Sequence, residues 1–138
     1  QTCALPILAT LTYMSLEQGL LTGKVALNRI FKESEFRSNM QWNPWFRLEN
    51  RARVLDLLDG WKDLTKKYEC SLAQLVIAWT LAQSGVTHAL CGARNEHQVL
   101  ENAHASDLQI TNADLKRMRA DIEHLGEPKI EEHHAEAS

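Results

Sequence analysis

The 138-residue sequence has no excess of basic residues and no long apolar run. Its 15 lysines and arginines are outnumbered by 18 acidic residues, which gives a net charge of −3. A nucleic-acid-binding surface needs a cationic excess to neutralise phosphates, so nucleic acid is not expected as a partner. No apolar stretch approaches the roughly 20 residues that a transmembrane helix needs, so no membrane partner is expected either.

Cysteines are few, and no secretory signal is expected. Cys3, Cys70 and Cys91 are odd in number and far apart, which favours free thiols in a reducing compartment over a disulfide framework. The first residues do not form a basic stretch followed by an apolar core. We therefore expect a cytoplasmic protein. The length suits one domain, and a hydrophobic content of 44% is enough for a core.

Apolar periodicity predicts a chain with both strands and helices. Leu8–Tyr13 has strand character, and Val86–Cys91 predicts a second, buried strand. Helical spacing predicts one helix over Glu49–Glu69 and an almost wholly apolar, buried helix over Leu72–Gln83, capped by Ser71. The second helix lacks a polar face, which argues against a helix-turn-helix DNA reader.

The last third of the chain predicts two more helices and a tail. One helix is expected over Glu96–His104, and another between the cap Thr111 and Leu125. Residues 127–138 are charged and poor in apolar residues, so we expect a disordered tail. Its two adjacent histidines have no partner at ligand spacing, and no metal site is expected.

The stretch from Ala89 to Asn102 has the pattern of a phosphate site. It reads as a strand end, a turn at Gly92 and a helix start, at which Asn95 and Gln98 would form a capping box. Unpaired N–H groups and the helix dipole favour an anion at such a start. Arg94 lies just before it, and its planar guanidinium suits a phosphate. An ordinary strand–helix turn with a surface arginine has the same pattern.

Two earlier segments have weaker signals of binding. Met14–Lys24 contains two glycines, with Ser15, Thr22 and Lys24 available to an anion, but it lacks the spacing of a P-loop and is equally a plain loop. Val25–Phe46 has no clean period and is predicted to be a long loop, of the kind that often covers a site. Its cations are Arg29, Lys32 and Arg37.

Three segments resemble those of the aldo-keto reductase family. Residues 13–24 (YMSLEQGLLTGK) are similar to the family pattern YSPLxQGLLTGK, residues 71–79 (SLAQLVIAW) to SxAQLALAW, and residues 92–102 (GARNEHQVLEN) to GA(R/S)NxxQLxEN. The three segments also occur in the order and at the spacing found in the family. The resemblance is closest to the bacterial branch that is similar to potassium-channel β subunits. Met14-Ser15 departs from the Ser-Pro of the family.

The resemblance implies a fold and a cofactor. Members are α/β proteins, (β/α)8 TIM barrels that reduce aldehydes and ketones with NADPH. Residues 8–126 would be the C-terminal part of such a barrel, with Leu8–Tyr13 as the seventh strand, Thr87–Cys91 as the eighth, their helices and the C-terminal helix. Barrel enzymes place site residues at the C-terminal ends of the strands.

The family motifs imply two groups of cofactor-binding residues in this sequence. The first would line the pyrophosphate: Ser15, Leu16, Gln18, Gly19, Leu20, Thr22 and Lys24, with Arg37 as a nearby cation. The second would hold the adenosine end: Gly92, Ala93, Arg94, Gln98, Glu101 and Asn102, with Arg94 near the 2′-phosphate.

No catalytic residue is expected in this sequence. The Asp, Tyr, Lys and His of the family belong to earlier strands, and Tyr13, Tyr68 and His88 do not match them. Residues 1–7 look like translated sequencing adapter and are expected to be non-native. We therefore expect a C-terminal fragment of an NADP-dependent reductase that is inactive alone. The alternatives are a non-catalytic NADP-binding regulatory subunit of the same fold and, if the motifs are chance matches, a small helical interaction protein.

Overall fold

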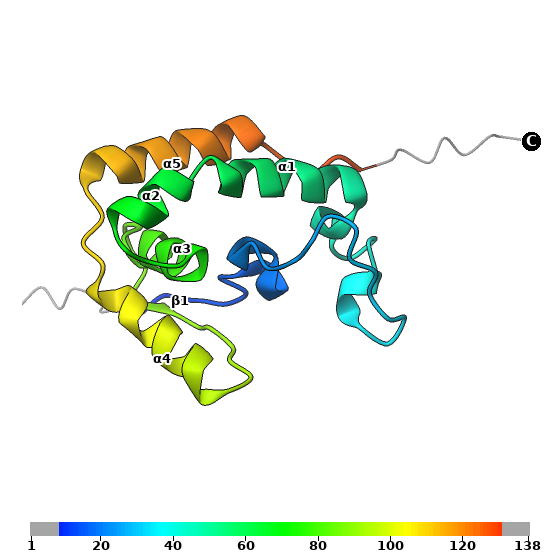
Figure 1. The fold of residues 1–138 in the computed structure, drawn as a ribbon, viewed down its shortest axis with the longest axis horizontal. Helices are drawn as coiled ribbons and strands as arrows, with labels where there is room; N and C mark the ends of the chain where they lie inside the picture. Colours follow the sequence, from blue (N-terminus) through cyan, green and yellow to red (C-terminus); the bar gives the residue numbers. More distant parts are fainter. Residues whose placement is uncertain (1–8, 131–138) are drawn as a thin grey trace, which may run out of the picture.

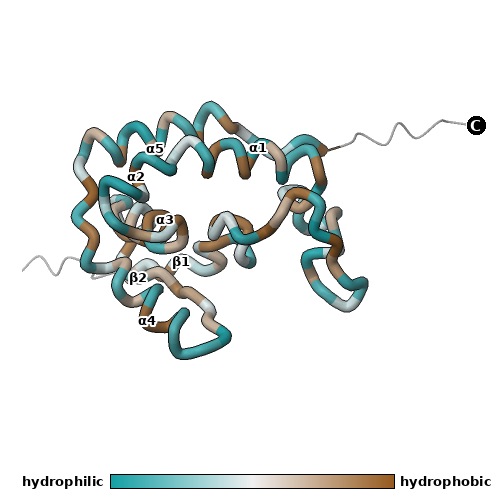
Figure 2. Tube along the Cα trace, viewed as in Figure 1, coloured by the Kyte–Doolittle hydropathy of each residue, from teal (hydrophilic) through white to brown (hydrophobic). Residues whose placement is uncertain are grey.

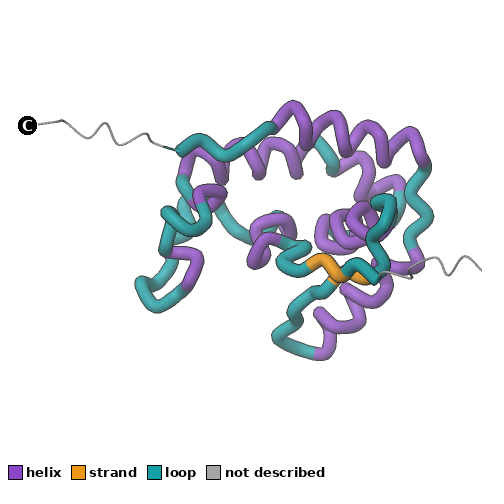
Figure 3. Tube along the Cα trace, turned by 180° about the vertical axis from the view of Figure 1, so that it is seen from behind, coloured by secondary structure: helices purple, strands orange, loops and turns teal. Residues whose placement is uncertain are grey.

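The structure is a computed structural model that describes residues 9–130; the expectations for residues 1–7 and 131–138 lie outside this range. Two long helices form an outer layer, a third lies between this layer and a short parallel sheet, and a fourth lies on the other side of the sheet (Figures 1 and 3). The α-helices are α1 (Leu48–Asp59), α2 (Lys62–Lys67), α3 (Leu72–Leu81), α4 (Glu96–His104) and α5 (Asn112–Leu125), and the strands are β1 (Leu11–Thr12) and β2 (His88–Ala89). Short 3₁₀ helices are η1 (Glu17–Thr22), η2 (Phe36–Ser38), η3 (Pro44–Phe46) and η4 (Ala105–Asp107).

The two expected strands are present and pair in parallel, but they are shorter than predicted. Leu11 aligns with His88, and the Leu90 N–H donates to the Thr12 carbonyl over 2.8 Å. The expectation of a buried second strand is wrong, because Leu90 remains 51% exposed. Within residues 9–130 the sheet has only these two strands, so neighbouring strands do not cover their apolar side chains.

The core lies between α1, α3, α5 and η1. Figure 2 shows α3 as a largely apolar segment and α5 as a largely hydrophilic one. The predicted burial of α3 is confirmed, and Leu75 is fully buried. Ser71 caps α3 in a complete capping box with Gln74. Gly23 packs beside this helix start at φ 69°, where an added Cβ would lie 2.7 Å from Leu72 Cδ1.

The single helix expected over Glu49–Glu69 is two helices, α1 and α2. The chain breaks at Gly60 and Trp61, and glycine is among the poorest helix formers. Trp61 remains buried, and its indole N–H donates to Asp121 of α5 over 2.9 Å. The predicted apolar face therefore continues across the break: Val54, Leu58, Trp61 and Leu64 are all buried.

The structure describes residues 127–130, with which the predicted tail begins. The buried side chain of Asn50 pairs with the backbone of Lys129: its Nδ2 donates to the Lys129 carbonyl and its Oδ1 accepts from the Lys129 N–H, each over 2.8 Å. Arg53 also donates to the carbonyls of Leu125 and Glu127. Polar contacts with α1 therefore order this segment despite its low apolar content.

Asp114 joins α5 to α2. Its carboxylate accepts hydrogen bonds from Lys67 over 2.6 Å, from the Tyr68 hydroxyl, and from Thr111 over 2.9 Å. Hydrogen bonding from Lys67, followed by that from Tyr68, lowers the pKa of Asp114 from 3.8 to about 2. Since the pKa is depressed in the folded state, the ionised carboxylate stabilises the fold above about pH 4.

We expect this contribution to stability to disappear as the pH falls from about 4 to about 2. Urea unfolding of the wild type and Asp114→Asn across this range measures it. The difference between their unfolding free energies should shrink towards the acid end, whereas Asp107→Asn, which changes an exposed carboxylate outside this cluster, should show no such trend. A pH-independent difference for Asp114→Asn would contradict the assignment.

Candidate functional site

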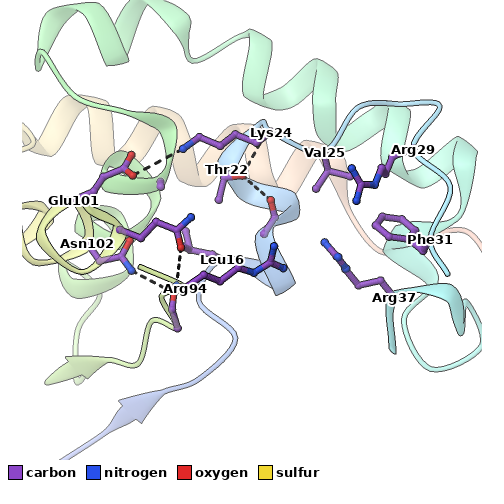
Figure 4. Close-up of a pocket in the computed structure, with 14 residues that line it drawn as sticks. Leu16, Thr22, Lys24, Val25, Arg29, Phe31, Arg37, Arg94, Glu101 and Asn102 are labelled. Atoms are coloured by element: carbon purple, nitrogen blue, oxygen red, sulfur yellow. Dashed lines mark hydrogen bonds and ion pairs between the residues drawn. The ribbon is translucent and has the colours of Figure 1, made fainter. Parts of the chain in front are cut away.

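Most residues predicted to bind a cofactor surround one cavity. This first cavity, of about 230 Å³, lies between η1, the loop that follows it, and the turn into α4 (Figure 4). Ten of the predicted residues line it: Leu16, Gly19, Thr22, Lys24, Arg37, Gly92, Arg94, Gln98, Glu101 and Asn102. Segments that lie about 75 residues apart in the sequence therefore meet here, because each follows one of the two paired strands.

A second, adjoining cavity of about 490 Å³ contains three further predicted residues, Ser15, Gln18 and Ala93. The two cavities share Leu16, Gly19, Gly92, Arg94 and Gln98. Leu20 is different, because its side chain is fully buried in the hydrophobic core and lines neither of them. Its side chain anchors the η1 turn in the core.

Four residues of the first cavity were not among the predicted ligands: Val25, Arg29, Phe31 and Ala73. Arg29 is recognisable in the sequence only as one cation of a long loop. Phe31 and Val25 come from the same loop, in which no period marks an inward-facing side chain. Only the folded path of the loop identifies them.

The turn of η1 has an unusual backbone. Gln18 and Gly19 both have positive φ values, 51° and 92°, and glycine adopts this region without strain. The Thr22 hydroxyl donates to the Gly19 carbonyl over 2.7 Å and accepts from the Lys24 N–H over 3.2 Å. The Gln18 Nε2 atom is buried and has no hydrogen-bond partner among the described residues.

The start of α4 is held by side chains that also line the first cavity. Asn95 caps the helix and accepts from the Gln98 N–H over 3.0 Å, as predicted. The expected capping box is only half formed, because Gln98 Oε1 accepts from the N–H of Arg94, over 2.8 Å, instead of that of Asn95. Asn102 Nδ2 donates to the Gly92 carbonyl over 3.4 Å. Together these bonds fix the turn that carries Arg94.

The first cavity is strongly cationic. Lys24, Arg29, Arg37 and Arg94 line it, against a single carboxylate, that of Glu101, which lies 3.9 Å from Lys24 Nζ. Within the described part of the chain, the Arg94 guanidinium forms no hydrogen bond or ion pair. An unpaired guanidinium beside the N-terminus of a nine-residue helix suits an anionic group such as a phosphate.

Arg37 lies on the opposite wall from Arg94 (Figure 4). It pairs with Glu35, and the hydrogen bond from Arg37 lowers the pKa of that carboxyl. The guanidinium also lies over the Phe31 ring, 4.7 Å from its centroid. Arg37 is therefore held in place before any ligand binds.

Groups suited to acid–base, nucleophilic or metal chemistry are scarce around the two cavities. Neither cavity has a described tyrosine or histidine in its wall. Cys91 lines the second cavity, but partial burial raises the pKa of its thiol, which disfavours the nucleophilic thiolate. Residues 9–130 contain no group of three or more side chains placed to hold a metal ion. The helices in this range are also too short or too polar to span a membrane.

Comparison with known proteins gives consistent matches. A sequence profile described as the Aldo/keto reductase family matches residues 3–123. The NADH-specific methylglyoxal reductase of Escherichia coli is 38% identical over 82% of this chain and 33% of its own length. A probable voltage-gated potassium channel subunit beta of Oryza sativa is 37% identical over 70% of this chain and 29% of its own.

A solved structure agrees with these sequence matches. The glycerol dehydrogenase of Gluconobacter oxydans superposes with a TM-score of 0.75 at 28% identity, covering 90% of this chain and 37% of that one. The chain spans about a third of the length of the relatives that it matches.

Proposed function

Because the chain belongs to the aldo/keto reductase family, we propose that it forms part of the cofactor site of an NADP-dependent oxidoreductase that reduces aldehydes or ketones by hydride transfer. The observation that carries the proposal is the cationic first cavity, where two segments with the family motifs meet around an unpaired Arg94. The alternative is a non-catalytic NADP-binding subunit, which the similarity to a probable channel subunit favours.

The proposal assigns β1 and β2 to the seventh and eighth strands of a (β/α)8 barrel. Their parallel pairing and the similarity to the glycerol dehydrogenase support this assignment. Both cavities are lined in part by the turns that follow these strands, residues 14–22 and 90–94, and barrel enzymes build their sites at this end. The last two helices, α4 and α5, would then close the outer ring.

The cavities offer the contacts that a dinucleotide needs. Under the proposal, the η1 segment with Lys24 and Arg37 binds the pyrophosphate, while Gly92, Arg94 and the start of α4 bind the adenosine end. The guanidinium of Arg94, which has no partner among residues 9–130, is a donor that such a ligand would satisfy. We propose NADPH because Arg94 suits a 2′-phosphate; NADH is the alternative, since the Escherichia coli relative is NADH-specific.

When bound, the cofactor supplies the hydride, and this chain supplies binding and orientation. Reduction of a carbonyl also needs a general acid within hydrogen-bond reach of its oxygen. The described walls of the two cavities contain no tyrosine or histidine for this role.

We also propose a cytoplasmic location, which the free thiols of Cys70 and Cys91 support.

We expect the 138-residue chain to bind NADPH but to lack carbonyl reductase activity. Cofactor fluorescence measures binding, and the absorbance of NADPH with a simple aldehyde measures turnover. NADPH oxidation above a protein-free control would show that the chain carries an acid we have not identified. Absence of NADPH and NADH binding by a folded chain would overturn the proposed site.

A further inference from the structure

Arg51 is a buried cation that lies outside both cavities. It occupies the first turns of α1, and only 3% of its surface is exposed. Its guanidinium donates to four backbone carbonyls, those of Ala26 over 3.5 Å, Leu27 over 2.8 Å, Arg29 over 2.9 Å and Phe46 over 2.6 Å. The bonds to Leu27 and Arg29 hold the start of the loop over residues 25–46, and the bond to Phe46 holds its end.

The same guanidinium supports the aromatic ring in the wall of the first cavity. Arg51 lies 5.1 Å from the centroid of the Phe31 ring, and Arg37 lies 4.7 Å from the same centroid. The Phe46 ring packs edge-on against the Phe31 ring, with the two centroids 5.4 Å apart and an interplanar angle of 86°. Phe31 is thus in contact with one buried arginine and with one that lines the cavity.

We propose that Arg51 is a positioning residue for the two loop cations of the first cavity, Arg29 and Arg37. It fixes the backbone of Arg29 directly, and it fixes Arg37 through the Phe31 ring. The inference rests on the proposed function, because it assumes that these cations meet the phosphates of the cofactor.

The physical basis is preorganisation. A guanidinium can bond several carbonyls at once because its donors form a rigid fork, which a lysine ammonium cannot reproduce. Without Arg51 the loop ends lose these bonds, and the loop has to be ordered again whenever a ligand binds, at a cost in conformational entropy. The partners of Arg51 that the structure describes are carbonyl oxygens and no carboxylate, so no charged partner is left unpaired when Arg51 is replaced.

The test is a double-mutant cycle for NADPH affinity, measured on the whole chain. Arg51→Met should weaken binding about tenfold, the size expected for losing one charge-assisted contact. In a background that already carries Arg29→Ala and Arg37→Ala, the same change should cost less than about twofold, because Arg51 then has no cation left to position. Arg117→Met is the matched control: Arg117 also donates to a backbone carbonyl, that of Gly60 over 2.8 Å, but its other partner is Asp63 of α2 and it lines neither cavity, so NADPH affinity should stay within about twofold.

Two further measurements separate positioning from loss of the fold. Arg51→Lys keeps a positive charge but not the fork, so its affinity should fall between those of the wild type and Arg51→Met while its far-ultraviolet circular dichroism stays that of the wild type. Competition by inorganic pyrophosphate should weaken in Arg51→Met, whereas competition by adenosine 2′-phosphate, the ligand proposed for Arg94, should not.

The possible outcomes distinguish the two proposals. Equal losses from Arg51→Met in both backgrounds would overturn the positioning role and leave the cofactor site intact. If the folded wild type binds neither NADPH nor pyrophosphate, the site and the role of Arg51 both fall.

Discussion

Arg94→Ala should weaken NADPH binding by about ten- to a hundredfold and change NADH binding little. The guanidinium has no partner among the described residues, and it lies beside the capped start of α4. A charge-assisted bond to the 2′-phosphate contributes roughly 1.5–3 kcal/mol, which corresponds to about one to two powers of ten in affinity. NADH has no group at this position and should not lose a contact. Titration of both cofactors into wild type and variant measures the difference.

Controls for Arg94 follow from its geometry. Arg119→Ala removes the same charge from α5, outside both cavities, and should leave the two affinities unchanged. The effect of Arg94→Ala should shrink at high salt, since Arg94 is exposed. Equal losses for NADH and NADPH would mean that Arg94 supports the turn instead of reading the 2′-phosphate.

Phe46→Ala should lower the free energy of unfolding by about 3–5 kcal/mol, the usual cost of truncating a buried phenylalanine. Phe46 is fully buried and ends the 25–46 loop. It belongs to the hydrophobic core and packs edge-on against Phe31 of the same loop. Its carbonyl also accepts the Arg51 bond, which a repacked backbone would disturb. Urea unfolding followed by circular dichroism measures the loss, and a chain of marginal stability would show no cooperative transition at all.

Phe36→Ala is the matched control for Phe46→Ala. Phe36 belongs to the same loop but is 57% exposed, so its truncation should change the free energy of unfolding by no more than about 0.5 kcal/mol. Similar losses in the two variants would contradict the assignment of Phe46 to the core. NADPH affinity, measured on whatever fraction remains folded, should fall only for Phe46→Ala.

Much of the cavity walls is predictable from sequence because ten residues of the first cavity belong to short contiguous motifs, whereas Val25, Arg29 and Phe31 come from a loop without a pattern. The helix caps Ser71, Asn95 and Thr111 are likewise confirmed, since a cap depends on residues three positions apart. Local patterns also explain why the sequence predicts one helix where the structure has α1 and α2. The apolar period continues across Gly60, although the helix ends there.

Long-range polar contacts have no such local pattern. Asn50 and Lys129 are 79 positions apart, and nothing near either residue indicates that they meet. The role of Arg51 is equally hidden, because an arginine in an amphipathic helix usually faces solvent. Such side chains become recognisable only when their burial and partners are known.

The pairing of Asn50 with Lys129 determines which substitutions the segment after α5 can accept. Asn50 contacts only the backbone N–H and C=O of residue 129, so the identity of that side chain is not recognised. Any residue that retains an N–H should be accepted there, and proline alone removes the donor. The Lys129 ammonium also pairs with Glu49, but both side chains are exposed and such a pair adds little stability. Selection for a stable fold should therefore constrain position 129 only weakly and position 50 strongly, because aspartate at position 50 would place a second acceptor opposite the Lys129 carbonyl.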